Sequence, residues 1–456
     1  MRITGIPRSR LTLAGSLAIG LSSMGYIAAT GPAMADYTAA APAAPAGILP
    51  IPDYTGDFGE RKFLFGDFGG KRTEWANNGV QFNVESLSWT DTVVDGGIDD
   101  DTQVGSNLTY NLNIDLMRAG ILPGALISIR AETRFGDSGN VKTGRVMPMN
   151  TAALSPTNYS AVDDGYDFAV TNLTYLQMLS EHFGVIVGKF DLYGDGLGNE
   201  FATGRGHTKF QNWSLNSAAA TLLIPASTVG VGAVFLPNPN LNILTLLTSA
   251  TECTKSNCFD DLDEGGIFIF KASYQYNMSG LPGGVTGGGS YTFDRDFTKL
   301  DSLSFSPGEG LGTSTKDSMW LVTADFWQYL WTKGRHSGPV NLANRETDLQ
   351  GVGLFGSFGF ADKDVNPYKT SFTFGVGGRG LFDARPDDSF GIGYYYNDLS
   401  KARFLDKVDD GQGAEAFYNF AITPGVRFTT GAQWIKSPGS RIDDAIVLST
   451  RLQMTF

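Results

Sequence analysis

The sequence contains little of what several classes of protein require. Only two cysteines and three histidines occur among 456 residues, which argues against a disulfide scaffold and against a metal site of thiolates and imidazoles. Acidic residues outnumber basic ones by 47 to 34, so the chain lacks the basic face that a nucleic-acid partner requires. Charged residues make up only 18% while aromatic residues make up 12%, a balance that argues against disorder. Nothing in the sequence implies a cofactor, a nucleotide or a bound metal.

Long apolar runs are rare as well. Residues 1–35 combine a basic start, an uncharged apolar stretch and Ala33-Met34-Ala35, the pattern of a secretory signal peptide and its cleavage site. Residues 213–251 carry no charge, but three prolines interrupt them, whereas a spanning helix needs about 20 mainly apolar residues. We expect the leucines of residues 241–247 to pack inside an ordered loop.

The clearest pattern in the sequence is the alternation of apolar and polar residues with a period of two. At the C-terminus Ile446, Leu448 and every second residue onward to Phe456 form one face, and Ser449, Arg451 and their neighbours form the other. In an extended strand such alternation places one face against an apolar medium and the other against water. Candidate strands lie near 80–90, 106–118, 124–135, 169–180, 183–192, 219–225, 228–236, 266–278, 284–294, 318–331, 347–360, 370–383, 388–397, 414–423, 425–435 and 444–456.

The connections between these strands mostly alternate between long and short, which is typical of an outer-membrane barrel with long external loops and short periplasmic turns. The connection at 331–347 is long where a short turn is expected. Aromatic residues such as Tyr394, Tyr396 and Trp434 fall near the ends of apolar faces, as in the girdles at bilayer interfaces. We predict an all-β fold, a transmembrane antiparallel β-barrel of about 16 strands. A large secreted β-protein is the alternative.

The predicted organisation has three parts. Residues 1–35 form the signal peptide, residues 36–79 form an N-terminal periplasmic segment, and residues 80–456 form the barrel. Lys71 to Asn77 could make two helical turns that end at Asn78-Gly79. The expected short helix would lie at the periplasmic mouth.

Four sets of residues then resemble a known family, the carbohydrate-selective porins of the OprB type. Gly66-Asp67-Phe68-Gly69-Gly70-Lys71-Arg72-Thr73 with Asn78-Gly79-Val80 resembles the family's opening, with Phe68 in place of the usual Trp. Similar segments follow in the family's order: Arg134 to Ser138; Val187 to Phe190 with Asn199 to Ala202 and Phe210 to Asn212; and Tyr418 to Gly439, where Ser437 replaces the common Asn. The resemblance covers residues 53–456. It implies a sixteen-stranded outer-membrane channel that admits glucose and related sugars.

The third strand offers the first candidates for the channel constriction. Arg130, Glu132 and Arg134 share one face, and an Arg on a lipid face would cost about 2–4 kcal/mol at the bilayer midplane. That face is therefore expected to point inward, either as a sugar-binding eyelet or as a charge ladder that only stabilises the wall. The resemblance adds weight at Arg134.

Further candidates follow on the fifth strand and in the long loop after it. Lys189 and Asp191 are expected to project together from that strand. Trp213 could either stack against a sugar or pack inside the loop.

Other features carry weaker expectations. Asp99, Asp100 and Asp101 form an acidic external loop, and a second acidic group occupies residues 260–264; both are expected to be solvated rather than bound to Ca²⁺. A disulfide between Cys253 and Cys258 is expected in an oxidising compartment.

The predicted function is passive, selective diffusion of glucose and related carbohydrates, with outer-membrane lipids around the barrel and no nucleic-acid partner. A general diffusion porin without sugar preference and a secreted lectin-like protein are the alternatives. An enzyme is disfavoured because the only histidines are His182, His207 and His336. His182 and His336 lie in predicted periplasmic turns, and neither has a convincing Ser or Asp partner by parity. A homotrimer and a monomer both stay open.

Overall fold

The computed structural model describes residues 47–144, 147–154, 156, 167–193, 198–259, 262–302, 304–306, 310–312, 314–334, 349–400, 408–437, 439 and 441–456. The expected signal peptide at residues 1–35 and His336 lie outside these residues.

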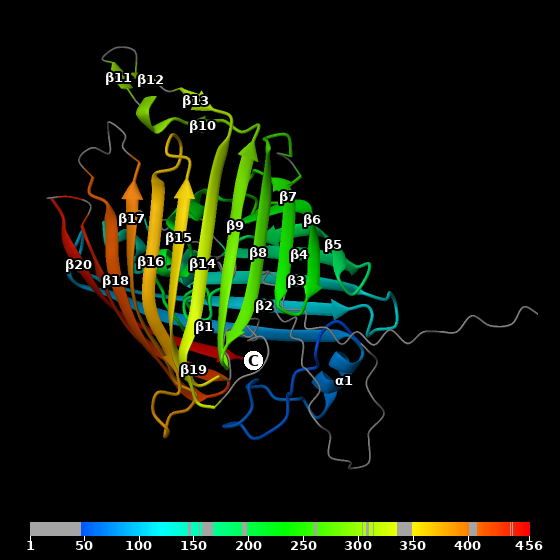
Figure 1. Ribbon diagram of the computed structural model, residues 1–456. Coiled ribbons are helices and arrows are strands. Elements are labelled where there is room, and N and C mark those ends of the chain that lie inside the picture. The colour runs from blue at the N-terminus through cyan, green and yellow to red at the C-terminus, as the bar shows by residue number, and fades with distance from the viewer. Residues whose placement is uncertain are drawn as a thin grey trace, which may run out of the picture.

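Within this part of the chain, sixteen strands pair antiparallel and close into a single barrel, because the first strand pairs with the last (Figure 1). This architecture confirms the predicted fold class. The barrel strands are β1 (Val80–Gly97), β2 (Thr102–Asp115), β3 (Ala125–Gly136), β4 (Asp167–Met178), β5 (Phe183–Asp191), β6 (Ser227–Asn238), β7 (Leu241–Ser249), β8 (Gly266–Met278), β9 (Leu281–Phe293), β14 (Met319–Thr332), β15 (Gly351–Ala361), β16 (Tyr368–Arg379), β17 (Ser389–Leu399), β18 (Gly411–Thr423), β19 (Val426–Ile435) and β20 (Asp443–Thr455).

The two ends of the barrel differ. Figure 1 shows α1 (Lys71–Asn77) and the C-terminus at one end, which we call the helix end. The opposite end, the loop end, carries two small two-stranded sheets, β10 (Phe297–Thr298) with β13 (Thr315–Lys316) and β11 (Ser304–Ser306) with β12 (Gly310–Gly312). Most connections at the helix end are tight turns. The longest connection at this end is 333–350, as the sequence indicated, although only its ends are described.

The remaining helical elements lie in loops. They are α2 (Trp213–Asn216) and the 3₁₀ helices η1 (Gly139–Val141), η2 (Thr151–Leu154), η3 (Ala219–Leu223) and η4 (Leu300–Ser302). No helix among the described residues is long and apolar enough to cross a membrane.

Two sequence assignments were wrong. Residues 219–223 form η3 rather than a strand, and Leu222 packs against Trp213 in a loop core. Residues 241–249, expected to be a loop, form β7. The period-two signal fails there because Leu244 and Leu246 are buried in an internal apolar cluster while Leu247 is exposed on the outer face, so both faces of the strand are apolar.

The alternation elsewhere corresponds to the two sides of the wall. On β20, Leu448 is 50% exposed on the outer face, whereas Val447 and Arg451 are buried inside the barrel. Aromatic residues continue the outer face on other strands: the exposed Phe372 of β16 stacks on the half-buried Tyr396 of β17 with ring centroids 5.5 Å apart. An apolar outer face and a polar inner face are what a barrel in a bilayer requires.

The N-terminal segment joins the two ends of the chain at the helix end. Arg72 of α1 is buried, and its guanidinium lies 4.3 Å from the Tyr54 ring centroid and 4.7 Å from that of Phe63. The same guanidinium donates hydrogen bonds to the carbonyl oxygens of Phe82, at 2.7 Å, and Phe456, at 3.3 Å. Arg72 therefore ties α1 to the first strand and to the C-terminal residue.

Helix α1 ends where the sequence predicted. Gly79 has φ +89°, and a Cβ at this position would lie 2.3 Å from the carbonyl oxygen of Asp115. A residue with a side chain does not fit here, because the chain must turn directly from the helix into β1 beside β2.

Candidate functional site

The long connection between β5 and β6 folds into the barrel. We call residues 192–226 the constriction loop; the structure describes it except for 194–197. Most of its described side chains are buried, including Phe201 and Phe210, which pack on Tyr329, Phe355 and Phe417 of the wall. The loop therefore occupies part of the lumen and narrows it.

Charged wall residues hold the backbone of this loop. The carboxylate of Glu415 on β18 accepts hydrogen bonds from the N–H groups of Gln211, at 2.6 Å, and Asn212, at 2.8 Å. Arg451 on β20 donates to the carbonyl oxygens of Gly206, at 2.5 Å, and Lys209, at 2.8 Å. Hydrogen bonds to charged groups contribute about 1.5–3 kcal/mol each, so these contacts fix the loop against the wall.

Additional anchors lie on other strands. Asn199 donates to both carboxylate oxygens of Asp325 on β14, at 3.0 and 3.1 Å. The Gln211 side chain donates to Asp91 on β1 at 2.9 Å. The loop is thus held on several sides of the barrel, which suits an element that must keep a fixed aperture.

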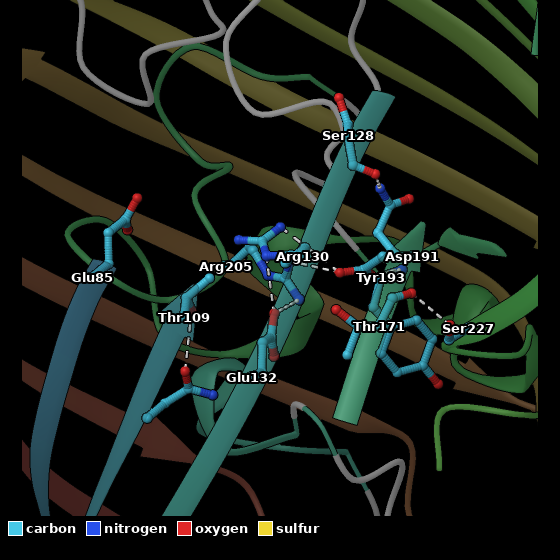
Figure 2. Close-up of polar contacts among 12 residues, drawn as sticks. Glu85, Thr109, Ser128, Arg130, Glu132, Thr171, Asp191, Tyr193, Arg205 and Ser227 are labelled. Carbon is cyan, nitrogen blue, oxygen red and sulfur yellow. Dashed lines mark hydrogen bonds and ion pairs between the residues drawn. The ribbon is translucent and has the colours of Figure 1, made fainter. Parts of the chain in front are cut away.

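The loop also meets β3 and β5 in a cluster of four charges, drawn in Figure 2. Arg205 of the loop donates to Asp191 at 2.9 Å and lies 3.3 Å from Glu132. Arg130 lies 3.1 Å from Glu132 and 3.8 Å from Asp191. We call Arg130, Glu132, Asp191 and Arg205 the constriction cluster. All four residues are buried.

The geometry of β3 explains two of these positions. Ser128, Arg130, Glu132 and Arg134 alternate on the inner face and are all buried, as the parity argument predicted. A register shift where β3 pairs with β4 turns both Thr171 and Asn172 toward the interior. The wall beside the cluster is therefore polar.

The cluster contains two guanidinium groups and two carboxylates, so its formal charge is balanced. Arginine only donates hydrogen bonds, and an ionised carboxylate only accepts them. A hydroxyl group can do both, so the cluster offers matched partners to a solute that carries many hydroxyls. The balanced charge gives it little attraction for a simple ion of either sign.

The other sequence candidates lie elsewhere. Arg134 donates to the carbonyl oxygen of Ala153 in the β3–β4 loop at 2.6 Å. Lys189 does not join Asp191 as expected; its amine donates to the carbonyl oxygens of Cys253, Thr254 and Ser256 at 2.8–3.1 Å. On β5, Lys189 falls on the same face as the exposed Val185 and Val187, which directs it to the loop between β7 and β8.

Trp213 lies in the core of the constriction loop. Only 2% of its surface is exposed, and its ring centroid is 4.8 Å from that of Tyr193. The Tyr193 hydroxyl donates to the carbonyl oxygen of Leu222 at 3.0 Å, and burial raises the pKa of that hydroxyl. The structure therefore places Trp213 in the packing role rather than on a channel surface.

Sequence reasoning missed Arg205 as a site residue and Glu415 as an anchor. Glu415 could have been found, because period two on β18 places it on the inner face with Phe417 and Asn419. Arg205 gives no such signal, because its position depends on how the loop folds.

The loop end carries a disulfide and an ion pair in the two loops that the sequence singled out. Cys253 and Cys258 form a disulfide. Asp99 pairs with Lys142 at 2.7 Å, and this hydrogen bond raises the pKa of Lys142. Among the described residues, no group of three or more His, Cys, Asp or Glu side chains is placed to hold a metal ion; residues 260 and 261 of the second acidic group lie outside the described part.

The sequence profile of the carbohydrate-selective porin family OprB matches residues 100–456. The chain belongs to this family. It is therefore a sugar-selective porin of the Gram-negative outer membrane, and both the family and the fold indicate a channel rather than an enzyme.

Individual relatives agree with this assignment. This OprB-family chain is 23% identical to Porin B of Pseudomonas aeruginosa over 445 residues, which cover 87% of the chain and 91% of Porin B. It is 22% identical to the putative porin QuiX of Acinetobacter baylyi, covering 87% and 94% of the two chains.

Solved structures support the same fold. The high-pH structure of Pseudomonas putida OprB superposes with a TM-score of 0.73 at 19% identity, covering 88% of this chain and all of that one. The low-pH structure of the same protein gives a TM-score of 0.52 at 18% identity, covering 87% and 99%.

Proposed function

We propose that this porin selects neutral monosaccharides such as glucose, and that the constriction cluster is its selectivity site. The observation that carries the proposal is the meeting of Arg130, Glu132, Asp191 and Arg205 between the wall and the inward loop. Arg134 and Trp213 act one step away, because each holds the backbone or the core of a loop beside the lumen. Lys189 holds the loop between β7 and β8 from the outer face of β5.

The chemistry of the cluster favours hydroxyl-rich solutes. A sugar whose hydroxyls replace part of the ion pairing among the four buried groups exchanges one set of hydrogen bonds for another, so it binds without a large net gain. Conduction requires this balance, because a solute must be attracted enough to enter and must still leave. A non-sugar solute of the same size lacks the paired donors and acceptors, so it cannot form the replacement hydrogen bonds.

Single-channel current through the purified protein in a planar bilayer tests the proposal. Glucose should block the current in a concentration-dependent way, and a non-sugar of equal size should not. Equal block by both solutes would favour the general diffusion porin. Absence of any current would reject the channel.

Variants locate the site. Arg130→Ala should weaken glucose block about 10- to 100-fold, because a hydrogen bond to a charged group contributes about 1.5–3 kcal/mol. Arg130→Ala combined with Arg134→Ala should weaken it at least as much. Arg441→Ala is the matched control, since Arg441 is an exposed arginine at the loop end. Unchanged block in the double variant would defeat the assignment of β3.

The same proposal assigns the surroundings. The helix end, with residues 47–79, faces the periplasm after removal of residues 1–35, and the apolar outer face contacts outer-membrane lipids. All four cluster residues come from one chain. Each chain therefore carries a complete channel, whether it assembles as a homotrimer or acts as a monomer.

A further inference from the structure

A second lumenal pocket lies at the helix end, separate from the constriction cluster. Glu200 and Lys209 of the constriction loop line one side, and the strands β14 and β16 to β19 line the other. Three of its residues, Arg379, Asp387 and Arg427, also line an adjoining hollow at the mouth of the barrel. The pocket is therefore reached from the helix end, where β16 to β19 descend in Figure 1.

Two arginines from different strands converge in this pocket. Arg379 is the last residue of β16 and follows the inner-face positions Ser371 and Thr373 in the period-two pattern. Arg427 occupies the second position of β19, also on the inner face. Both contact one residue of the β16–β17 turn: Arg379 pairs with the Asp387 carboxylate at 2.6 Å, and Arg427 donates to the Asp387 carbonyl oxygen at 2.9 Å.

The pocket has an excess of positive charge. Lys209, Arg379 and Arg427 contribute three positive groups, while Glu200 and Asp387 contribute two negative ones. This excess of one is opposite in sign to the whole chain, whose formal charge is −13. The Asp387 carboxylate is 56% exposed by its side chain, so water and solutes reach the ion pair.

Aromatic rings and hydroxyls complete the lining. Phe201 and Tyr329 meet edge to face with centroids 4.9 Å apart, and Phe417 lies on the same wall. Thr208 and Ser389 add hydroxyl groups. An apolar wall suits the C–H side of a pyranose, and the planar fork of arginine matches the geometry of a carboxylate.

We propose that this pocket binds acidic sugars, meaning pyranoses that carry a carboxylate. The sugar carboxylate pairs with Arg379 and Arg427 in place of their contacts with Asp387. The sugar ring lies toward Phe201 and Phe417. The inference rests on the proposed function only in that the barrel must conduct sugars. It extends the solutes of this porin from neutral sugars to their acids and assigns the acids a site of their own.

Isothermal titration of the purified full-length mature protein in detergent tests the proposal with three probes. Glucuronate carries a pyranose and a carboxylate, glucuronamide carries the same ring without the charge, and acetate carries the charge without the ring. We expect glucuronate to bind at least about tenfold more tightly than either of the others, with an affinity that falls as salt rises.

Variants of the two arginines decide the location. Arg379→Gln combined with Arg427→Gln should weaken glucuronate binding at least about tenfold and leave glucose block of single-channel current unchanged. Arg385→Gln is the matched control, because Arg385 lies in the same turn and pairs with Asp388 outside the pocket; it should leave glucuronate affinity within about twofold. Potassium chloride conductance and heat-modifiable gel migration establish that each variant is folded.

Three results would overturn the proposal: equal affinity for glucuronate and glucuronamide, equal affinity for glucuronate and acetate, or an unchanged affinity in the folded double variant. Loss of glucose block in the Arg130 variants tests the constriction cluster instead. The two proposals therefore fail independently.

Discussion

Glu415 offers a direct test of how the constriction loop is held. Its two carboxylate oxygens each accept one backbone N–H, from Gln211 and Asn212, and only 1% of the residue is exposed. Glu415→Gln keeps the size and shape of the side chain but replaces one acceptor oxygen with an NH₂ group. That group then faces a backbone N–H, so one hydrogen bond is lost and one buried donor is left unsatisfied.

The expected cost follows from these two changes. A hydrogen bond to a charged group contributes about 1.5–3 kcal/mol, and a stranded buried donor costs about 1–3 kcal/mol. The two contributions add to about 2.5–6 kcal/mol, and the middle of that range, about 3–4 kcal/mol, is comparable with the free energy of opening for a lumenal loop held by several such contacts. Because 1.4 kcal/mol corresponds to a factor of ten, local opening should become roughly 10²- to 10³-fold more frequent.

Hydrogen exchange measured on a peptide that covers residues 206–216 reports this opening. In Glu415→Gln the protection of this peptide should fall by two to three orders of magnitude, while peptides from β1 and β2 keep theirs. Single-channel current should become noisier, because the aperture fluctuates with the loop. Glu181→Gln is the control, since Glu181 is exposed in the turn between β4 and β5. Unchanged protection at 206–216 would show that Glu415 does not anchor the loop.

Two further predictions concern the helix end. Arg72→Met removes the guanidinium from three aromatic rings and from three carbonyl oxygens, so it should lower the free energy of unfolding by about 2–4 kcal/mol; a denaturant titration followed by gel migration measures this, and an unchanged midpoint would contradict it. Burial would raise the pKa of Asp388, but the hydrogen bonds from Arg385, the Ala421 N–H and Tyr418 outweigh burial and hold it below the ordinary value of 3.8. Because its pKa is lower in the folded than in the unfolded chain, ionised Asp388 stabilises the fold at pH values above its unfolded pKa, and this stabilisation is lost as the pH falls through its folded pKa. Asp388→Asn should therefore be less stable than the native chain at neutral pH and should lose less stability on acidification below about pH 4. Acid titrations of the two proteins that run parallel would refute this assignment.

Most of the wall could be predicted because a bilayer imposes a simple rule on it. Each residue of a strand faces either lipid or the interior, and the faces alternate. The apolar Leu448 and the charged Arg451 can therefore be assigned to their faces from residue type alone. The rule fails where the interior is itself apolar. Leu244 and Leu246 pack with Leu49 and Phe190 inside the barrel, which removes the alternation of β7 and hides the strand.

In the candidate site, too, strand parity determines which residues could be predicted from the sequence. Arg130, Glu132 and Asp191 were predicted because each belongs to a strand, and the first two follow from parity. Lys189 was placed with Asp191 although it reaches the carbonyl oxygens of another loop. Its parity with Val185 and Val187 carried the correct information, but a lysine at the end of a strand satisfies an outer-face position by bending toward backbone acceptors.

The constriction loop could not be placed by any local rule, and the reason is physical. Its position depends on polar contacts with strands that are distant in sequence: Asn199 binds Asp325, Gln211 binds Asp91, and the N–H groups at 211 and 212 bind Glu415. The groups that make these contacts are polar side chains and backbone N–H groups that occur equally on solvent-exposed surfaces, so residue type does not identify them as anchors. Arg205 can meet Asp191 only after the other anchors have fixed the loop, so the donor that completes the constriction cluster is set by the closed barrel as a whole. Under the proposed function, selectivity therefore also depends on residues such as Glu415 that hold the loop without touching solute, and the exchange experiment measures how firmly Glu415 holds it.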